Sequence, residues 1–304
     1  MAAAASPSAA ARVLLVDASP YIFRAYFALP ASLVDREGRQ ANGVYGFGSF
    51  LLKLIADERP THLGVAFDRS LTTSFRNEIY PDYKRQRELP PPALEAQLDD
   101  CRALAHALGA ATFVDDRYEA DDLIATLCAR LPGERVVVVT SDKDLAQLVD
   151  ERVGWLDHAR GRRYGPRDVR ERFGVEASRI PDLLGLAGDP VDNIPGVRGI
   201  GPGTALALLG HFASLEDLVA RREEIARLGL RGGARIQRLI AEQGEVALLS
   251  KTLATVARDA PLTATLADLR LRPPRRAALD ALCGRLGFEA LHRRILERGS
   301  GGAA

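Results

Sequence analysis

Short apolar runs recur along the first half of the chain, and an acidic residue follows each of them. The three clearest are residues 13–16 before Asp17, residues 61–67 before Asp68, and residues 136–139 shortly before Asp142. Turn-forming or polar residues bound these runs, so we predict three strands. The run of four valines has no polar position, which is typical of a strand in a parallel sheet covered by helices on both faces.

Segments with helical character separate the predicted strands. We expect helices at residues 21–29, 43–55, 94–108 and 166–173. Strands that alternate with helices predict an α/β fold with a mostly parallel sheet flanked by helices. Near residue 180 the pattern changes to short helices interrupted by Gly and Pro, which predicts a second, helical region.

Composition limits the class of protein. The 304 residues can hold one large domain or one domain with a smaller appendage, and 47% of them are hydrophobic, enough for a core. The formal net charge is only +1, so any affinity for nucleic acid must come from local patches. Cys101, Cys128 and Cys283 are widely spaced, and we expect reduced, buried thiols of a cytosolic protein.

Neither a membrane span nor a signal peptide is predicted. No apolar run approaches the roughly 18 residues that a membrane-spanning helix needs. Residues 2–11 are Ala, Ser and Pro without a basic start, so we expect residues 1–11 to be a disordered tail.

The acidic residues at the strand ends are the candidate chemistry. A single Asp at such a position is usually a cap, but Asp17, Asp68 and Asp142 are all expected at one edge of one sheet. Asp144 and the sequence 119–122, which is Glu-Ala-Asp-Asp, add further carboxylates. Two like charges about 4 Å apart repel by roughly 4 kcal/mol at an effective dielectric of about 20. Such a cluster needs cations, and oxygen ligands without nearby His or Cys favour Mg²⁺ or Mn²⁺ over zinc.

Residues 69–92 combine basic and aromatic side chains and end in a run of prolines. The basic members are Arg69, Arg76, Lys84, Arg85 and Arg87, and the aromatic members are Phe75, Tyr80 and Tyr83. One interpretation is a solvated connecting loop. The other is a lid above the acidic edge that grips phosphates and stacks on bases.

The segment 199–203, Gly-Ile-Gly-Pro-Gly, superficially matches a dinucleotide-binding fingerprint. It follows a proline-rich turn instead of a strand, so that interpretation has little support. A Gly-rich hairpin between two short helices would instead offer backbone N–H groups to a DNA phosphate. Arginines within residues 228–238 are either a second backbone contact or, as we favour, the solvated face of a helix.

Residues 270–298 predict a small helical hairpin.

Six motifs in this order resemble the 5′–3′ exonuclease and flap endonuclease family. They are Val16-Asp17 with Phe23-Arg24, Phe67-Asp68, the segment from Phe75-Arg76 to Tyr83-Lys84, residues 118–122, residues 141–144, and residues 188–201. The likeness covers about residues 12–265. It is greatest to the amino-terminal nuclease domain of bacterial DNA polymerase I, and we expect a stand-alone protein without a polymerase.

The resemblance implies a PIN-like core at residues 12–180, with an arch at 69–92. It also implies a helix-three-turn-helix region at 181–265, followed by a helical extension and frayed end at 266–304. One metal ion is expected at Asp17, Asp68, Glu119 and Asp121, and the second at Asp142, Asp144 and Asp192. In the same motifs, Asp122 and Asp189 are expected to act through bound water. A potassium ion is expected at the hairpin 199–201.

The resemblance also assigns DNA contacts. Phe23 is expected to stack on a base, while Arg24, Arg76 and Lys84 steer the scissile phosphate. Further expected DNA contacts are Tyr83, Arg87, Arg198, Gly199, Gly201 and Thr204. One position departs from the family pattern: Gly203 stands where relatives usually carry Lys, which removes an expected phosphate contact and should weaken duplex binding.

The expected activity is Mg²⁺-dependent or Mn²⁺-dependent hydrolysis of DNA at 5′ ends and 5′ flaps, in replication and repair. We expect a monomer in the bacterial cytoplasm, associated with the nucleoid during repair and functionally linked to a DNA polymerase and a ligase. The alternatives are a PIN-type ribonuclease and a DNA-structure-binding protein without catalysis.

Overall fold

A sheet flanked by helices forms the centre of the molecule. The computed structural model describes residues 12–70 and 73–300. The tail predicted at residues 1–11 and the last residues of the predicted frayed end, 301–304, lie outside the described residues. The strands are β1 (Val13–Asp17), β2 (His62–Asp68), β3 (Ala111–Asp115), β4 (Val136–Val139), β5 (Val153–Asp157) and β6 (Arg162–Tyr164). The three strands predicted from apolar runs are therefore confirmed as β1, β2 and β4.

The strand order is β3-β2-β1-β4-β5-β6, with β6 alone antiparallel to its neighbour. From β1 the chain adds β2 and β3 on one side and then returns to add β4 on the other. The switch point between β1 and β4 is where open α/β sheets bind their ligands. Val16 pairs with Val65 and with Val139, so β1, β2 and β4 end near one another. This register brings the acids that follow these strands to one edge.

Strand β3 was not predicted. It is an edge strand whose five residues are all half-buried, so it lacks the apolar run of the central strands. It too ends in an acid, but Asp115 accepts hydrogen bonds from the backbone N–H groups of Arg117 and Tyr118, at 2.8 and 3.0 Å. Asp115 therefore closes the turn that follows its own strand.

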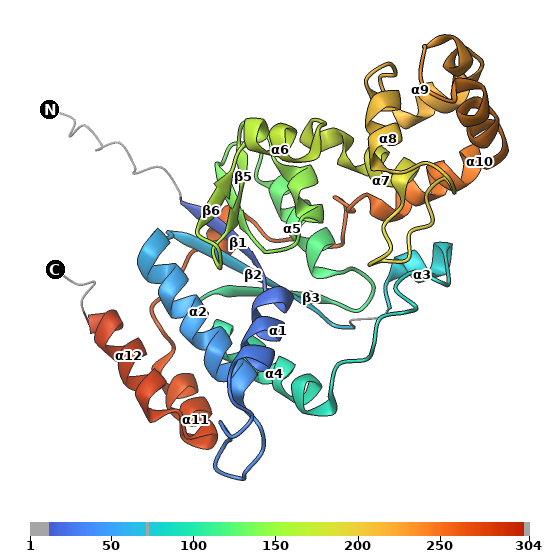
Figure 1. Ribbon diagram of the computed structural model, residues 1–304. Helices are drawn as coiled ribbons and strands as arrows, with labels where there is room; N and C mark the ends of the chain where they lie inside the picture. The colour runs from blue at the N-terminus through green and yellow to red at the C-terminus, as the bar shows by residue number, and fades with distance from the viewer. Residues whose placement is uncertain (1–11, 71–72, 301–304) are drawn as a thin grey trace, which may run out of the picture.

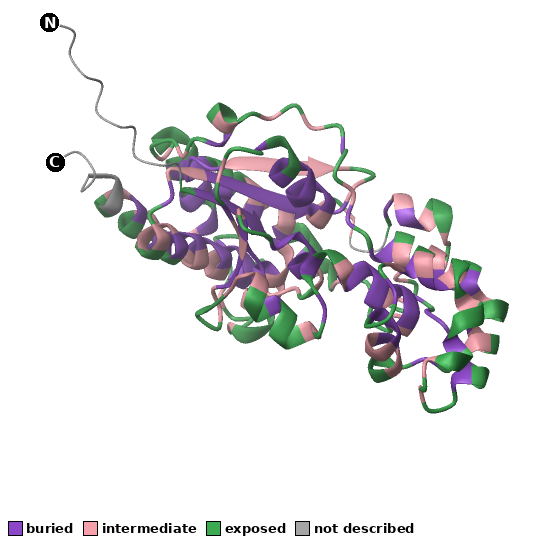
Figure 2. Ribbon diagram, turned by 90° about the horizontal axis from the view of Figure 1, so that it is seen from above, coloured by how far each residue is buried: buried purple, intermediate pink, exposed green. Residues whose placement is uncertain are grey.

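Helices cover both faces of the sheet (Figure 1). One face packs against α1 (Ser19–Ala28), α2 (Asn42–Glu58) and α4 (Pro92–Ala107), while α11 (Arg276–Leu286) and α12 (Glu289–Ser300) form an outer layer on α4 and α2. The other packs mainly against α5 (Ala120–Arg130) and the short helix η1 (Asp144–Leu148). Successive strand residues point to opposite faces, so Leu14 and Val16 join the first core and Val13 and Leu15 the second. Figure 2 shows the central strands buried beneath these layers.

A helical lobe follows the sheet along the chain, as predicted from the change of pattern near residue 180. It contains α6 (Pro166–Phe173), η2 (Ala177–Arg179), α7 (Ile180–Ala187), α8 (Pro202–Leu209), α9 (Leu215–Ala220), η3 (Arg222–Arg227) and α10 (Gly233–Ala254). These helices share an apolar core of their own with Trp155. After α10 the chain returns through η4 (Leu266–Leu269) to the sheet, where α11 and α12 pack against α4 and α2.

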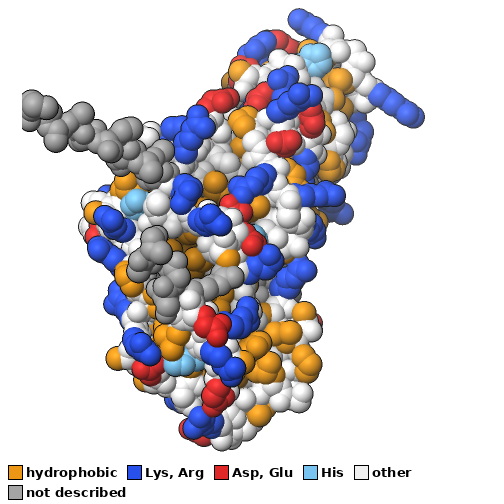
Figure 3. Space-filling view, turned by 90° about the vertical axis from the view of Figure 1, so that its left-hand side faces the viewer, with side chains coloured by type: hydrophobic (Ala, Val, Ile, Leu, Met, Phe, Trp, Pro, Cys, Tyr) orange, Lys and Arg blue, Asp and Glu red, His pale blue; other side chains and the backbone are white. Residues whose placement is uncertain are grey.

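Several expectations from composition can be compared with the structure. The three cysteines are buried free thiols, as predicted. None of the described helices combines the length and apolar character needed to cross a bilayer. On the face in Figure 3, basic, acidic and apolar side chains are intermixed, in keeping with the net charge of +1.

Candidate active site

A cavity of about 330 Å³ opens at the edge where β1, β2 and β4 end. Seven carboxylates from separate parts of the chain line it, together with Phe23, Lys84 and Arg87. They are Asp17, Asp68, Glu88, Glu119, Asp121, Asp142 and Asp192. The structure therefore brings together six of the nine residues that were expected to serve metal ions.

Hydrogen bonds from neighbouring residues orient two of these acids. The hydroxyl of Thr140 donates to Asp17 at 2.8 Å, and the hydroxyl of Ser19 donates to Asp68 at 2.6 Å. The first backbone N–H of α5 also donates to Asp68, at 2.8 Å. Neither Ser19 nor Thr140 was among the predicted site residues. Their only signal was their position, since Ser19 follows Asp17 by two residues and Thr140 precedes Asp142 by two.

Burial and mutual repulsion make the ionised forms of these acids costly. Burial raises the pKa of Asp17, and the charges of Asp68 and Asp142 raise it further. Burial likewise raises the pKa of Asp121, with Asp17 adding to the effect. Burial, and next the charge of Asp142, raises the pKa of Asp144 to about 7. A divalent cation would reverse this effect, because it favours the ionised carboxylates.

The donor set fits a hard divalent cation. Every acidic group that lines the cavity offers carboxylate oxygen, and neither His nor Cys lines it. Within residues 12–70 and 73–300, however, no group of three or more His, Cys, Asp or Glu side chains is already arranged to coordinate one ion. Basic side chains lie between the acids instead.

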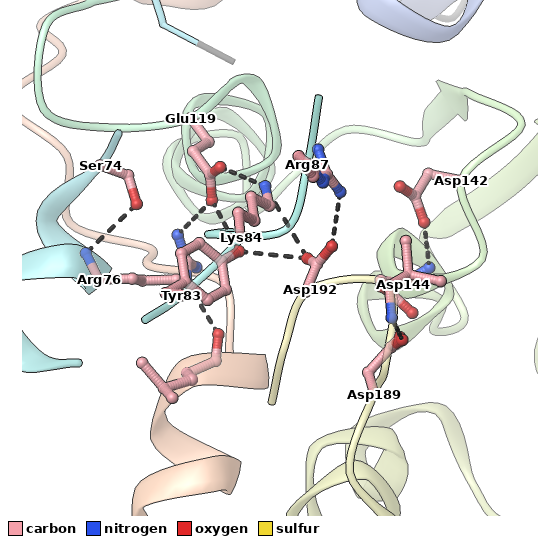
Figure 4. Close-up of polar contacts among 12 residues, drawn as sticks. Ser74, Arg76, Tyr83, Lys84, Arg87, Glu119, Asp142, Asp144, Asp189 and Asp192 are labelled. Atoms are coloured by element: carbon pink, nitrogen blue, oxygen red, sulfur yellow. Dashed lines mark hydrogen bonds and ion pairs between the residues drawn. The ribbon is translucent and has the colours of Figure 1, made fainter. Parts of the chain in front are cut away.

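Those basic side chains come from the arch segment (Figure 4). The Lys84 ammonium pairs with Glu119 and lies 3.8 Å from Asp192, and Arg87 pairs with Asp192 at 2.5 Å. The Tyr83 hydroxyl donates to the same two acids, at 3.1 Å to Glu119 and 3.2 Å to Asp192. The arch cations therefore act as counter-ions to the acidic cavity.

Backbone contacts attach the arch to the loop before α8. The Lys84 N–H donates to the Asp192 carbonyl at 3.0 Å, and the Asn193 side chain donates to the Asp82 carbonyl at 2.6 Å. Gln86 donates to the carbonyl of Pro190 at 2.7 Å. Among the described residues of the arch, only α3 (Phe75–Ile79) is helical. Hydrogen bonds to the loop before α8 hold much of the rest of the described arch in position.

Arg76 and Asp122 lie behind the cavity wall and do not line it. Arg76 is 2% exposed and Asp122 is 0% exposed. Two hydrogen bonds of 2.8 Å join the guanidinium to Asp122, and a third of 2.9 Å joins it to Glu119. Arg76 also donates to the carbonyls of Leu253 and Thr255, at 2.8 and 3.0 Å. This buried pair ties α3 to α5 and to the end of α10, and it holds Glu119 toward the cavity.

Asp144 and Asp189 lie beside the cavity (Figure 4). The Lys143 ammonium is 3.0 Å from Asp189 and 3.4 Å from Asp144. The Asp144 N–H donates to Asp142 at 2.9 Å, so these two acids share one turn after β4. The side chain of Asp144 is 22% exposed and that of Asp189 is 4% exposed, so Asp144 is the more accessible of the two.

The remaining predicted residues lie at two other places. Arg24 follows Phe23 on α1 but lines a separate cavity between α1 and α2. Arg198, Gly199 and Gly201 are exposed on the hairpin that joins α7 to α8, and Thr204 is half-buried in the first turn of α8. Gly199 has φ +98°, a conformation that strongly favours glycine. The hairpin thus presents backbone to solvent, as its sequence predicted.

Two family models together match most of the chain. The 5′–3′ exonuclease, N-terminal resolvase-like domain matches residues 12–174, and the 5′–3′ exonuclease, C-terminal SAM fold matches residues 175–277. The first match covers the sheet and the acidic cavity except for Asp192. The second covers the hairpin and most of the helical lobe.

Curated relatives and solved structures agree with these matches. DNA polymerase I of Bacillus caldotenax is 40% identical over 92% of this chain, and that of Bacillus subtilis is 37% identical over 94%. The chain spans 32% of the length of each relative. Two solved structures have the same fold. Zinc-bound T5 5′-exonuclease superposes with TM-score 0.65 at 22% sequence identity, and the match covers 95% of this chain and 99% of the exonuclease chain. Human GEN1 with Holliday junction DNA superposes with TM-score 0.64 at 13% identity, and the match covers 94% of this chain and 71% of the GEN1 chain. The chain belongs to the 5′–3′ exonuclease family.

Proposed function

We propose that this protein is a divalent-metal-dependent 5′–3′ exodeoxyribonuclease and 5′-flap endonuclease. One observation carries the proposal: seven carboxylates from the ends of three strands, the arch, the start of α5 and the loop before α8 line a single cavity. Family membership makes phosphodiester hydrolysis the chemistry that this cavity would perform. The substrate would be DNA with a free 5′ end or a 5′ flap.

The carboxylates would hold two ions, Mg²⁺ or Mn²⁺. Asp17, Asp68, Glu119 and Asp121 would hold the first, and Asp142, Asp144 and Asp192 the second. Bound ions would supply an activated water molecule and stabilise the negative charge of the transition state. Asp189, next to Lys143, would support the second group, whereas Asp122 would act through Arg76 as a positioning residue.

Basic and aromatic residues of this chain would handle the DNA. Lys84 and Arg87 reach into the cavity and would contribute positive charge at the scissile phosphate. Phe23 lines the same cavity and would stack on the terminal base. The exposed hairpin at 198–201 would bind the duplex backbone, with K⁺ at its carbonyls. The protein would act as a monomer at the bacterial nucleoid. Cleavage at 5′ ends would link it functionally to a DNA polymerase and a ligase.

The direct test is cleavage of a 5′-end-labelled flap DNA with Mg²⁺ or with EDTA, because product size separates exonuclease from flap cleavage. Asp142→Asn should reduce cleavage at least about 100-fold and leave flap binding within about twofold, since it removes a metal ligand but no phosphate contact. Normal turnover by this variant would refute the assignment. Faster cleavage of single-stranded RNA than of flap DNA would favour a PIN-type ribonuclease.

A further inference from the structure

The hairpin that joins α7 to α8 has little internal support for its shape. Within the described residues, the Ile200 N–H donates to the Val197 carbonyl at 2.9 Å, and the Val197 N–H donates to the Leu186 carbonyl of α7 at 2.8 Å. Gly196 and Gly199 have φ values of +59° and +98°, a backbone region that Gly populates freely. The conformation of the hairpin therefore depends on contacts from other elements.

Helix α10 supplies such contacts, although it comes much later in the chain. The Gly196 N–H donates to the hydroxyl of the buried Ser250 at 3.0 Å. Leu239 packs on Gly199, where a Cβ atom would lie 3.3 Å from a methyl group of the leucine. The two ends of the turn are therefore held from different parts of one helix.

A kink in α10 helps both parts of the helix to reach this turn. Leu239 and Ser250 are eleven residues apart, which is about 17 Å along a straight helix. Gly196 and Gly199 are three residues apart, so their Cα atoms are separated by at most about 11 Å. Gln243 lies at the kink, because its φ of −126° and ψ of 15° are non-helical inside α10. The bend turns the two halves of the helix toward one turn.

From the kink, the side chain of Gln243 reaches the hairpin. Its oxygen accepts a hydrogen bond from the Arg198 N–H at 2.9 Å, and its nitrogen donates a longer one, of 3.4 Å, to the Arg198 carbonyl. Both polar groups of the Arg198 backbone are then bound. The Arg198 side chain is exposed and forms no ion pair within the described part of the chain, so its charge is available to a ligand.

We propose that Gln243 is a positioning residue for duplex DNA binding and acts through Arg198. By holding the Arg198 backbone, it fixes the direction in which the guanidinium projects from the hairpin. A residue held in this way loses less conformational freedom when it pairs with a phosphate, so binding is tighter. The proposal rests on the duplex-binding part of the proposed function and not on cleavage.

Amide hydrogen exchange of the protein without DNA tests the contact itself. Gln243→Met keeps the length of the side chain and removes both hydrogen bonds, so the Arg198 N–H should exchange at least about tenfold faster. Gln237→Met is the matched control on the same helix. Gln237 contacts Glu223 and the Ala226 N–H of η3 instead of the hairpin, so this variant should leave exchange at Arg198 unchanged. Equal exchange at Arg198 in all three proteins would overturn the proposal.

Binding of a blunt duplex in EDTA tests the function, with Arg198→Gln as the reference. Arg198→Gln should weaken binding about fivefold and lower its salt dependence by about one ion. Gln243→Met should lower both quantities in the same direction, although it removes no charge. The double variant should bind about as weakly as Arg198→Gln alone, because Gln243 then has no guanidinium to position. Gln237→Met should bind like the wild type.

Additivity separates positioning from an independent contact. A double variant that binds about 25-fold more weakly than the wild type would mean that Gln243 acts without Arg198, which contradicts the proposal. Normal duplex binding by either single variant contradicts it as well. Thermal unfolding verifies that each variant is folded. A wild-type protein that binds no duplex also overturns the proposal, whereas one that binds duplex but cleaves no flap refutes only the nuclease function.

Discussion

At the residue scale, Arg76 and Lys84 show how burial separates side chains that look alike in the sequence. Both are basic members of the arch and both contact Glu119. Arg76 is enclosed behind the cavity wall, where its planar guanidinium satisfies a carboxylate and two carbonyls at once. Lys84 lines the cavity itself. The first is suited to positioning, and the second can reach a substrate.

The Arg76–Asp122 pair gives a stability prediction. Arg76→Met should lower the free energy of unfolding by about 3–5 kcal/mol, because it leaves the fully buried Asp122 without its partner. Adding Asp122→Leu should recover much of the loss, since the buried charge is then removed too. Urea denaturation of both variants measures the effect. Arg85→Gln is the control, and it should change stability by less than about 0.5 kcal/mol because Arg85 is exposed. If the single and double variants are equally unstable, the pair is not the cause.

At the element scale, the arch is attached to the loop before α8. The two segments lie far apart in sequence, yet hydrogen bonds of Lys84, Gln86 and Asn193 join them. Lys84 and Asn193 have positive φ values of 55°, so the backbone itself is shaped for this contact. The arch cations neutralise carboxylates that we propose as metal ligands.

Metal ions should therefore loosen the arch. Divalent ions compete with Lys84 and Arg87 for Glu119 and Asp192, so limited trypsin digestion at Lys84, Arg85 and Arg87 should be faster with Ca²⁺ than with EDTA. Asp192→Asn should speed the same cleavages in EDTA, since it removes one counter-ion. Mass spectrometry of the fragments identifies the sites, and cleavage at exposed Arg167 on α6 provides the internal control. Equal rates with and without Ca²⁺ would show that the arch does not respond to metal.

The hairpin allows a gain-of-function test at Gly203. Space around its Cα is open, so a side chain can be added. Gly203→Lys should strengthen duplex DNA binding and steepen its salt dependence by about one ion, because it adds one phosphate contact. Gly203→Gln is the matched control, since it makes a similar change in helix propensity without charge. Binding titrations at several salt concentrations measure both. If neither Gly203→Lys nor Gly203→Gln changes the salt dependence of DNA binding, residue 203 does not contact the DNA backbone.

At the scale of the whole molecule, the acidic cavity links stability to pH. Asp17, Asp68, Asp121 and Asp144 all have a raised pKa, caused first by burial. Between the ordinary aspartate pKa of 3.8 and the raised pKa of about 7 for Asp144, the folded chain binds more protons than the unfolded chain. The free energy of unfolding contributed by these groups therefore falls as pH rises through this window. Acids with a lowered pKa, such as Asp35, titrate below this window.

We expect the melting temperature in EDTA to decrease from about pH 5 to about pH 8, and Mg²⁺ to raise it more at the higher pH. The physical reason is that ionised carboxylates repel one another without ions and bind ions tightly. Differential scanning calorimetry gives both quantities. The double variant Asp17→Asn, Asp121→Asn should show a smaller decrease in EDTA. A stabilisation by Mg²⁺ that does not vary with pH would contradict this account.

Much of the fold could be predicted from local pattern. The buried strands β1, β2 and β4 have continuous apolar runs, and the short helices after residue 180 follow from Gly and Pro. The edge strand β3 was missed because its five half-buried residues lack such a run. In the candidate site, the acids at the strand ends could be predicted, because parallel strands end at the same edge of a sheet. The hydroxyls of Ser19 and Thr140 were not, since many residues adjoin an acid.

The sequence by itself determined the central strands β1, β2 and β4, the acids that follow them and the family motifs, because these depend on neighbours along the chain and on their order. Only the tertiary structure decided which charged residues face the cavity. It enclosed Arg76 with Asp122, turned Lys84 toward Glu119, and placed Arg24 at the separate cavity between α1 and α2. Burial and charge pairing arise between segments distant in sequence, so nothing local to these residues could distinguish them.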